Sequence, residues 1–219
     1  MLLLPIRRGL VAALATVALV SVALPGRARA QLTAAQAIEQ LSSTSTADLT
    51  AAIEAIGLSG SATAVGPLSD RIRRGLPPEL LGMAIDTLTV LGHAEAGPVL
   101  IELLSHRRED VRTRAVQALA VCNPPGLEAA LTAALSDPSP AVRAAAAIAL
   151  GEHAGPGALE ALFRAFDRRI AEAGLAIARI ADADASRRVL GYLGHEPFST
   201  LRPMLLAMLQ RTDLAQRAR

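Results

Sequence analysis

The side chains best suited to bind a metal are four histidines, His93, His106, His153 and His195. Three of them, His93, His153 and His195, lie in the similar stretches "LGHAEAG", "LGEHAGPG" and "LGHEPF". They therefore recur just after the expected ends of helices. Only His195 is followed directly by a glutamate, Glu196. A divalent metal needs several ligands that converge at fixed distances, and one such pair is too few. We therefore expect no metal site, and we interpret these histidines as side chains near the negative end of a helix dipole.

The sequence also lacks the patterns of nucleophilic and cofactor chemistry. Its single cysteine, Cys122, lies in "VQALAVCNPPG" at the end of an apolar stretch, so no disulfide can form within the chain. A thiol in such surroundings is most simply a small buried side chain. No glycine-rich phosphate loop and no serine-centred elbow occur in the sequence. We expect no catalytic residue and no cofactor.

Composition favours a helical protein. Apolar residues make up 52% of the 219 residues, but aromatic residues make up only 2%. The core must then consist of Ala, Leu, Val and Ile, which suits closely packed helices better than a β-sandwich.

The first thirty residues have the pattern of a secretion signal. Arg7 and Arg8 precede an apolar stretch from Leu10 to Leu24, and Ala28 and Ala30 are small residues at the positions that a signal peptidase reads. The apolar stretch has 15 residues, fewer than the ~20 that span a membrane. We expect cleavage after Ala30, a periplasmic or secreted location and no membrane span in the mature protein. The alternative is an anchor that is not cleaved.

The charge of the chain changes sign when this segment is removed. The whole chain has a net charge of +2, and the first thirty residues contain four arginines and no acidic residue. Because the segment carries +4, the part from Gln31 onward carries −2 by the same count. No basic stripe remains, so we do not expect the protein to bind nucleic acid.

The rest of the sequence repeats with a period near thirty residues. Val-Arg occurs at 111–112 and again at 142–143, and each copy begins a stretch rich in Ala and Leu. The expected helix ends are Ile56-Gly57, Leu91-Gly92 and Leu150-Gly151. A second apolar stretch follows each end after a turn that contains Gly or Pro. The pattern predicts four helical pairs between Ala47 and Asp167 and a weaker fifth pair after them.

The stretch "SDPSPAVRAAAAIALG" shows how one unit is expected to form. Asp137 is placed to cap the helix, and Pro140 lies near its first turn, where a missing N–H costs nothing. The alanines allow neighbouring helices to approach within the ~8–10 Å of packed pairs. Gly151 is expected to end the helix in a left-handed conformation. The second helix supplies larger side chains, namely Leu159, Leu162, Phe163 and Phe166.

The stretch "DPSPAVRAAAAIALGEHAGPGALEAL" resembles a HEAT repeat of the short bacterial type, which is grouped with phycobilisome-lyase HEAT-like repeats. The matching residues are Asp137, Pro140, Val142, Arg143, Ala146, Leu150, Gly151, Leu159 and Leu162. A second unit, "REDVRTRAVQALAVC", matches through Asp110, Val111, Arg112, Ala115 and Leu119.

This resemblance implies an all-α fold, an α-solenoid of about five HEAT-like helical pairs in a right-handed superhelix. It also implies inter-repeat links made by Asp110, Arg112, Asp137 and Arg143. The alternative for the two arginines is a solvated charge at the start of a helix. The expected organisation is a signal peptide at 1–30, a capping helix and linker at 31–46, repeats at 47–196, and a capping helix and tail at 197–219.

Solenoids bind partners on an extended concave face, which we expect the second helices to form. Alignment of the units places Glu128 and Thr132 at the positions of Glu160 and Arg164. Arg187 and Arg188 fall on the next second helix. These six residues form a mixed-charge surface, which suits a polar protein partner better than lipid. We therefore expect a non-catalytic scaffold or adaptor of the cell envelope whose partner is a protein.

Two alternatives remain. One is a metal-dependent or tetrapyrrole-handling enzyme, since bilin lyases share the repeat and a HEAT-repeat iron hydroxylase family holds two metals with His-Glu pairs on successive repeats. This sequence has one such pair, His195-Glu196, and a secreted chain is in the wrong compartment to load pigments. The other alternative is a purely structural accessory domain without a partner.

Overall fold

Helices make up almost all of the regular structure. The computed structural model describes residues 32–153, 155 and 157–211, so the predicted signal peptide and the last eight residues lie outside the described part. Within that part no strand occurs, and the one β feature is an isolated bridge between Leu193 and Glu196. The predicted all-α fold is confirmed.

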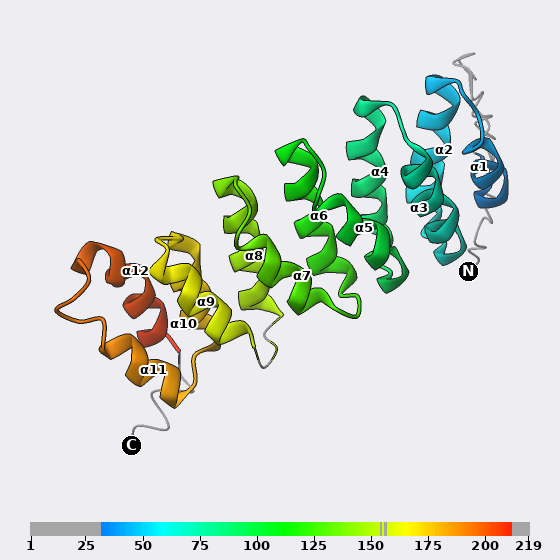
Figure 1. The fold of residues 1–219 in the computed structure, drawn as a ribbon. Helices are drawn as coiled ribbons and strands as arrows, with labels where there is room; N and C mark the ends of the chain where they lie inside the picture. The colour runs from blue at the N-terminus through cyan, green and yellow to red at the C-terminus, as the bar shows by residue number, and fades with distance from the viewer. Residues whose placement is uncertain (1–31, 154, 156, 212–219) are drawn as a thin grey trace, which may run out of the picture. The chain divides into compact units, whose positions relative to one another are not determined.

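The helices alternate between two layers (Figure 1). The first helices of the pairs are α2 (Thr46–Ser59), α4 (Pro78–Leu91), α6 (Glu109–Cys122), α8 (Pro140–Glu152) and α10 (Ala171–Ile180). The second helices are α3 (Val65–Arg74), α5 (Gly97–Leu103), α7 (Leu127–Ala134), α9 (Ala158–Asp167) and α11 (Ala183–Leu190). Helix α1 (Ala34–Gln40) precedes the first pair, and α12 (Phe198–Leu209) follows the last. The five predicted pairs are therefore present in the described residues.

The first helices pack side by side in a row, each against the next. Small side chains allow the helices of this row to approach one another closely. Ala146, Ala147 and Ala149 of α8, for example, are all buried. Larger side chains such as Leu162 and Phe166 fill the space between the layers, and both are buried. The core thus extends along the whole array of helices, as expected of a solenoid.

Two of the three predicted helix ends are wrong, and both errors concern glycine. Gly151 lies inside α8, and the helical hydrogen bond from His153 N–H to Ala149 O continues beyond it. A Cβ on Gly151 would lie 2.8 Å from the Cβ of Ala176, so this glycine allows α8 and α10 to approach closely. Gly57 lies inside α2, which ends at Ser59 and has Gly60, with a φ of 61°, as its C-cap. Gly92, with a φ of 67°, ends α4 in the left-handed conformation, as predicted.

The prediction that Asp137 caps α8 is also wrong. Pro140 is the first residue of α8, as expected, but the N-cap is Ser139, whose side chain makes no capping hydrogen bond. Asp137 instead accepts a hydrogen bond from the backbone N–H of Ser139 and two from the guanidinium of Arg112. The carboxylate therefore joins two units rather than capping one helix.

Candidate functional site

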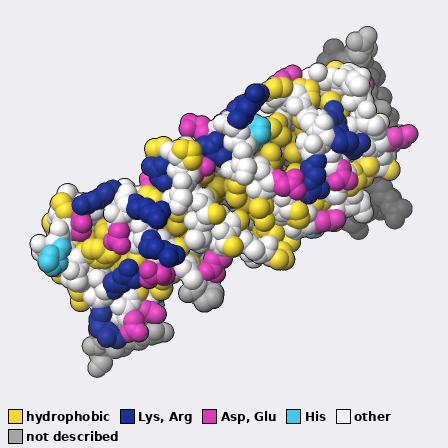
Figure 2. All heavy atoms as spheres, in the orientation of Figure 1, with side chains coloured by type: hydrophobic (Ala, Val, Ile, Leu, Met, Phe, Trp, Pro, Cys, Tyr) yellow, Lys and Arg dark blue, Asp and Glu magenta, His cyan; other side chains and the backbone are white. Residues whose placement is uncertain are grey.

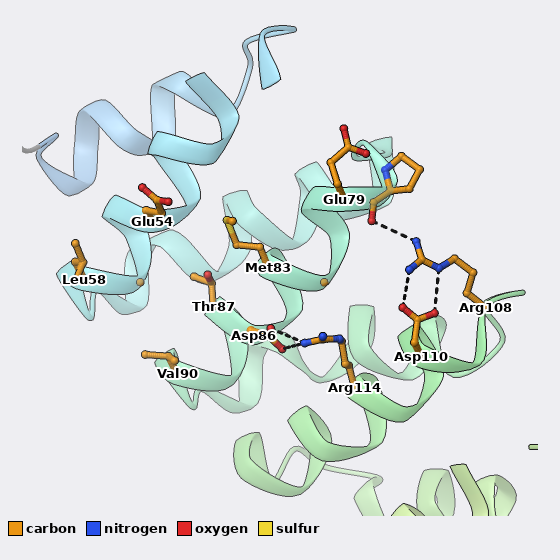
Figure 3. Close-up of a pocket in the computed structure, with 13 residues that line it drawn as sticks. Glu54, Leu58, Glu79, Met83, Asp86, Thr87, Val90, Arg108, Asp110 and Arg114 are labelled. Carbon is orange, nitrogen blue, oxygen red and sulfur yellow. Dashed lines mark hydrogen bonds and ion pairs between the residues drawn. The ribbon is translucent and has the colours of Figure 1, made fainter. Parts of the chain in front are cut away.

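A groove of about 730 Å³ crosses three consecutive first helices (Figure 3). Helix α2 lines it with Glu54, Gly57 and Leu58, and α4 lines it with seven residues between Pro78 and Val90. Arg108, which directly precedes α6, and Asp110 and Arg114 on α6 form its far side. The groove exists because successive first helices lie in one row and present equivalent faces.

Exposed apolar side chains line the groove. Leu58 is 82% exposed and Val90 is 73% exposed, although leucine and valine are usually buried. Met83, on the same helix as Val90, is half-buried. In Figure 3, Met83, Thr87 and Val90 follow one another along α4, and Glu54 and Leu58 face them from α2. This apolar surface lacks a covering element among the described residues.

Two glycines lie inside the helices that form the groove. A Cβ on Gly57 would approach the side chain of Thr87 no closer than 3.6 Å, and a Cβ on Gly82 would lie 3.6 Å from Arg114. Both distances are ordinary van der Waals contacts, so packing does not require either glycine. Glycine in a helix interior costs about 0.5–1 kcal/mol relative to alanine. The two residues lower helix stability and keep the floor of the groove free of side chains.

The charged residues of the groove divide into paired and unpaired groups. Arg114 donates to both carboxylate oxygens of Asp86, at 2.7 and 2.5 Å, and so joins α6 to α4. Arg108 donates to both oxygens of Asp110, at 3.0 and 2.6 Å, and these hydrogen bonds hold the pKa of Asp110 below its usual value.

Glu54 and Glu79 make no hydrogen bond or ion pair with a described residue. Because the groove contains four acidic and two basic side chains, its lining carries a net charge of −2. The two unpaired carboxylates account for that excess.

The predicted partner-binding residues on the second helices mostly have partners within the chain. Glu128 accepts a hydrogen bond from the N–H of Gly157 at 2.7 Å, across the boundary between two units. Arg188 forms an ion pair with Glu160 at 2.7 Å, which joins α11 to α9, and Arg187 pairs with Asp184 on its own helix. Figure 2 shows arginine and acidic side chains next to one another over the α9–α11 region. The other two predicted residues, Thr132 and Arg164, make no such bond with a described residue.

An aromatic cluster explains why Arg188 is held in place. Its guanidinium carbon lies 4.0 Å from the centre of the Phe163 ring, a cation–π contact. Tyr192 packs against Phe163 and Phe166 and donates a 2.6 Å hydrogen bond to Asp167. Burial and this hydrogen bond raise the pKa of Tyr192 to about 12. The cluster fixes α9 against α11, while the side chains of Arg188 and Glu160 remain partly exposed to solvent.

Of the four residues expected to link the repeats, two form a pair across units and two bond within their own unit. Arg112 on α6 and Asp137 before α8 form an ion pair at 2.7 Å. Asp110 bonds Arg108, two residues away. Arg143 donates to the backbone carbonyl of Asp137 at 2.8 Å, at the start of its own helix.

The residues weighed for catalysis do not converge. No group of three or more His, Cys, Asp or Glu side chains that could hold a metal occurs among residues 32–153, 155 and 157–211. The thiol of Cys122 is buried and donates to Leu88 O at 3.6 Å, and its burial raises its pKa. None of the helices in the described part is long and apolar enough to span a membrane.

The repeat pattern of the chain also appears in comparisons with known proteins. A family model described as HEAT repeats matches residues 34–120 and 97–178, which together exceed half of the chain. The chain belongs to the HEAT-repeat family. The expected resemblance is thereby confirmed, and the two overlapping matches cover α1 to most of α10.

Two further similarities place this HEAT-repeat chain among known proteins. The uncharacterized phycocyanin operon protein Z of Pseudanabaena tenuis (strain PCC 7409) is 38% identical over 82 residues. This match covers 33% of the chain and spans about 40% of the length of that relative. A designed armadillo repeat protein in complex with the peptide (KR)4 has the same fold, with a TM-score of 0.51 and 17% identity. That match covers 79% of this chain and 98% of the designed one.

The groove was not anticipated from the sequence, although the sequence contains a signal for it. Leu58, Val90 and Val121 occupy the same position in α2, α4 and α6, and all three are exposed. An apolar residue that recurs with the repeat looks like part of the core until the buried face of each helix is known. Glycine at 57 and 82, within stretches that otherwise suit a helix, was the second signal.

Proposed function

We propose that this HEAT-repeat protein is a non-catalytic scaffold that binds another protein along its row of first helices. One observation carries the proposal: each first helix from α2 to α10, and α12 after them, exposes a large apolar side chain. These residues are Leu58, Val90, Val121, Ile148, Leu175 and Leu206. Apolar surface that recurs in this way is typical of a protein-binding face. A repeat solenoid presents such a face over a long distance.

The fold and the second helices support this choice of surface. HEAT and armadillo repeats are typical of protein-interaction scaffolds, and the designed armadillo protein of similar fold was solved with a bound peptide. The polar residues first expected to bind the partner on the second helices, such as Glu160 and Arg188, bond one another instead. A partner that bound there would have to replace these bonds, whereas the apolar side chains of the first helices have no bonds to lose.

A photoreactive residue tests the proposal directly in living cells. It replaces Val90 on the first-helix row in one variant and Arg164 on a second helix in another, and crosslinked products are identified by mass spectrometry. We expect one defined protein to be crosslinked at position 90 and much less at position 164. The absence of a protein crosslink at both positions would reject a scaffold, and a crosslink at position 164 alone would place the partner on the second helices.

The same scaffold is proposed to work outside the cytoplasm, after cleavage behind Ala30. The support is the basic, apolar and small-residue pattern of residues 1–30. N-terminal sequencing of the protein from the periplasm or medium should read Gln31 first. A protein that begins at Met1 in the cytoplasmic fraction would contradict this location.

A second candidate is a tetrapyrrole-handling protein, which one observation favours. The relative that is 38% identical over 82 residues takes its name from a phycocyanin operon. Purified protein mixed with a linear tetrapyrrole should then show a shift of the pigment's visible absorbance at stoichiometric concentration. An unchanged pigment spectrum leaves the scaffold as the remaining function.

A further inference from the structure

We infer that the groove across α2, α4 and α6 binds an extended, basic segment of a partner protein with apolar residues between its basic ones. This inference rests on the proposed scaffold function and specifies the chemistry of its partner. Three features of the groove carry it: its unpaired negative charge, its exposed apolar side chains and its two glycines.

The charge of the groove selects a basic partner. Glu54 on α2 and Glu79 on α4 both line the groove and have no cationic partner among the described residues. The two arginines of the lining are already bound to Asp86 and Asp110. A segment with arginine or lysine side chains supplies the two positive charges that this surface lacks. An acidic segment would meet four carboxylates and find both arginines occupied.

The apolar side chains select what lies between those basic residues. Leu58 and Val90 are the exposed large apolar side chains of α2 and α4, and Met83 lies with them in the lining. Burial of such surface is the main favourable contribution when a peptide binds a groove. Charge alone would attract a basic chain anywhere on an acidic surface, whereas these residues also require an apolar side chain in the segment.

The glycines indicate that the surface serves binding rather than folding. Gly57 and Gly82 are interior residues of α2 and α4, and alanine would fit at both positions. Elsewhere in the row the close approach of helices accounts for a glycine, as at Gly151 against Ala176. At Gly57 and Gly82 the space that a Cβ would occupy belongs to the groove. A peptide backbone can therefore approach the helices at these two points.

The spacing of the helices sets the spacing of the basic residues. Packed helices lie ~8–10 Å apart, and Glu54 and Glu79 are also offset along α2 and α4 by roughly 10 Å, because one lies late and the other early in its helix. An extended chain advances ~3.3 Å per residue and its side chains alternate between two sides, so side chains four positions apart share one side and lie ~13 Å apart. A suitable probe is an eight-residue fluorescent peptide with two arginines four positions apart and a leucine midway between them on the same side. Two control peptides replace both arginines by glutamate or the leucine by serine.

Fluorescence anisotropy of the purified protein with this peptide tests the inference. We expect saturable binding of the Arg/Leu peptide and at least tenfold weaker binding of both control peptides. The double variant Glu54→Gln/Glu79→Gln should bind about tenfold more weakly, because it loses two ion pairs. The double variant Leu58→Ser/Val90→Ser should bind the Arg/Leu peptide more weakly by a similar factor. Both pairs of side chains are exposed, so circular dichroism should show an unchanged fold.

A matched variant separates the groove from general electrostatic attraction. Glu39→Gln/Glu172→Gln removes the same charge from α1 and α10, outside the groove, and should retain the wild-type affinity. Equal losses in both double-glutamate variants, or equal binding of all three peptides, would overturn the inference. If position 90 still crosslinks a protein in cells, the scaffold function stands and only this partner chemistry is wrong. If the peptide binds the groove but no crosslink forms in cells, the groove is real and the scaffold function fails.

Discussion

Arg112 donates two hydrogen bonds to the carboxylate of Asp137, from Nε at 2.7 Å and from Nη2 at 2.9 Å. The two side chains come from consecutive units and are only 11% and 9% exposed. The third nitrogen of the guanidinium, Nη1, donates to His106 O at 2.8 Å. All three guanidinium nitrogens and both carboxylate oxygens therefore have a hydrogen-bond partner, which a charged pair needs when it is removed from water.

Acid should weaken the fold through this pair. Burial of the Asp137 carboxylate opposes its ionisation, but the hydrogen bonds from Arg112 and Ser139 outweigh burial and hold the pKa of Asp137 below its usual value. The folded state then binds the proton less tightly than the unfolded state. The stabilisation is present above about pH 4, the ordinary pKa of the group, and is lost as the pH falls through the lower pKa of the folded state.

Asp137→Asn should therefore lower the melting temperature at pH 7 and reduce the loss of stability on acidification. Thermal unfolding followed by circular dichroism at a series of pH values measures both effects. Asp184→Asn is the matched control, since its pair with Arg187 lies on the surface of one helix. A variant at position 137 whose stability falls with acid as steeply as that of the wild type would show that this carboxylate does not carry the effect.

The same substitution should have opposite effects at two glycines. Gly151→Ala places a Cβ 2.8 Å from Ala176, so the helices must separate, and we expect a loss of about 1–3 kcal/mol. Gly82→Ala meets only ordinary contacts and should gain up to about 1 kcal/mol from helix propensity. Urea unfolding gives both values. Two changes of the same sign would mean that the α8–α10 contact does not control the effect.

Enlarging a buried alanine should be harmful although leucine is a good helix former. Ala146 is fully buried, so Ala146→Leu should cost about 1–3 kcal/mol through overpacking, against a propensity difference of a few tenths. Leu162→Ala should cost about 2–5 kcal/mol through the cavity that it leaves. Arg164→Ala, on the exposed side of the same helix as Leu162, should change stability by less than about 0.5 kcal/mol. If denaturant titrations found Ala146→Leu neutral, the close packing of α8 against its neighbouring helices at Ala146 would be disproved.

Tyr192 offers a spectroscopic measurement without mutagenesis, because it is the only tyrosine of the chain. Its pKa is raised to about 12 by burial and by the hydrogen bond to Asp167, so tyrosinate absorbance should appear near pH 12. The unfolded chain loses this proton near pH 10, so the stabilisation is complete below that pH and is lost as the pH rises to 12. Asp167→Asn should move the absorbance change toward pH 10. An unchanged titration would remove Asp167 as a cause.

The sequence was sufficient to predict the helices because helix formation depends mainly on near neighbours. The apolar spacing and the recurring Val-Arg pairs gave five pairs, and Pro140 begins α8 as expected. The role of Gly151 was not predictable in this way. A glycine after a run of alanines has the pattern of a helix end. Only the contact with Ala176, 25 residues further on, shows that Gly151 lies where α8 and α10 pack closely together.

The site was harder to predict for the same physical reason. Glu160 and Arg188 have the solvent-facing spacing of a binding surface, but they pair with each other across 28 residues. Leu58 and Val90 are apolar residues that recur with the repeat, as core residues do, but both are exposed. Local periodicity shows which residues share one side of a helix. It does not show which side the next helix will cover.

The buried pair of Arg112 and Asp137 also makes one joint of the array unlike the others. The ion pairs Arg73–Glu102, Arg114–Asp86 and Arg179–Glu152, which also join neighbouring units, are exposed to solvent. Dissolved ions screen exposed pairs far more than buried ones. If the array is stretched end to end in concentrated salt, the joints with exposed pairs should therefore yield at lower force than in dilute salt. The junction between α6 and α8 keeps its buried pair, so the force needed to open it should depend least on salt.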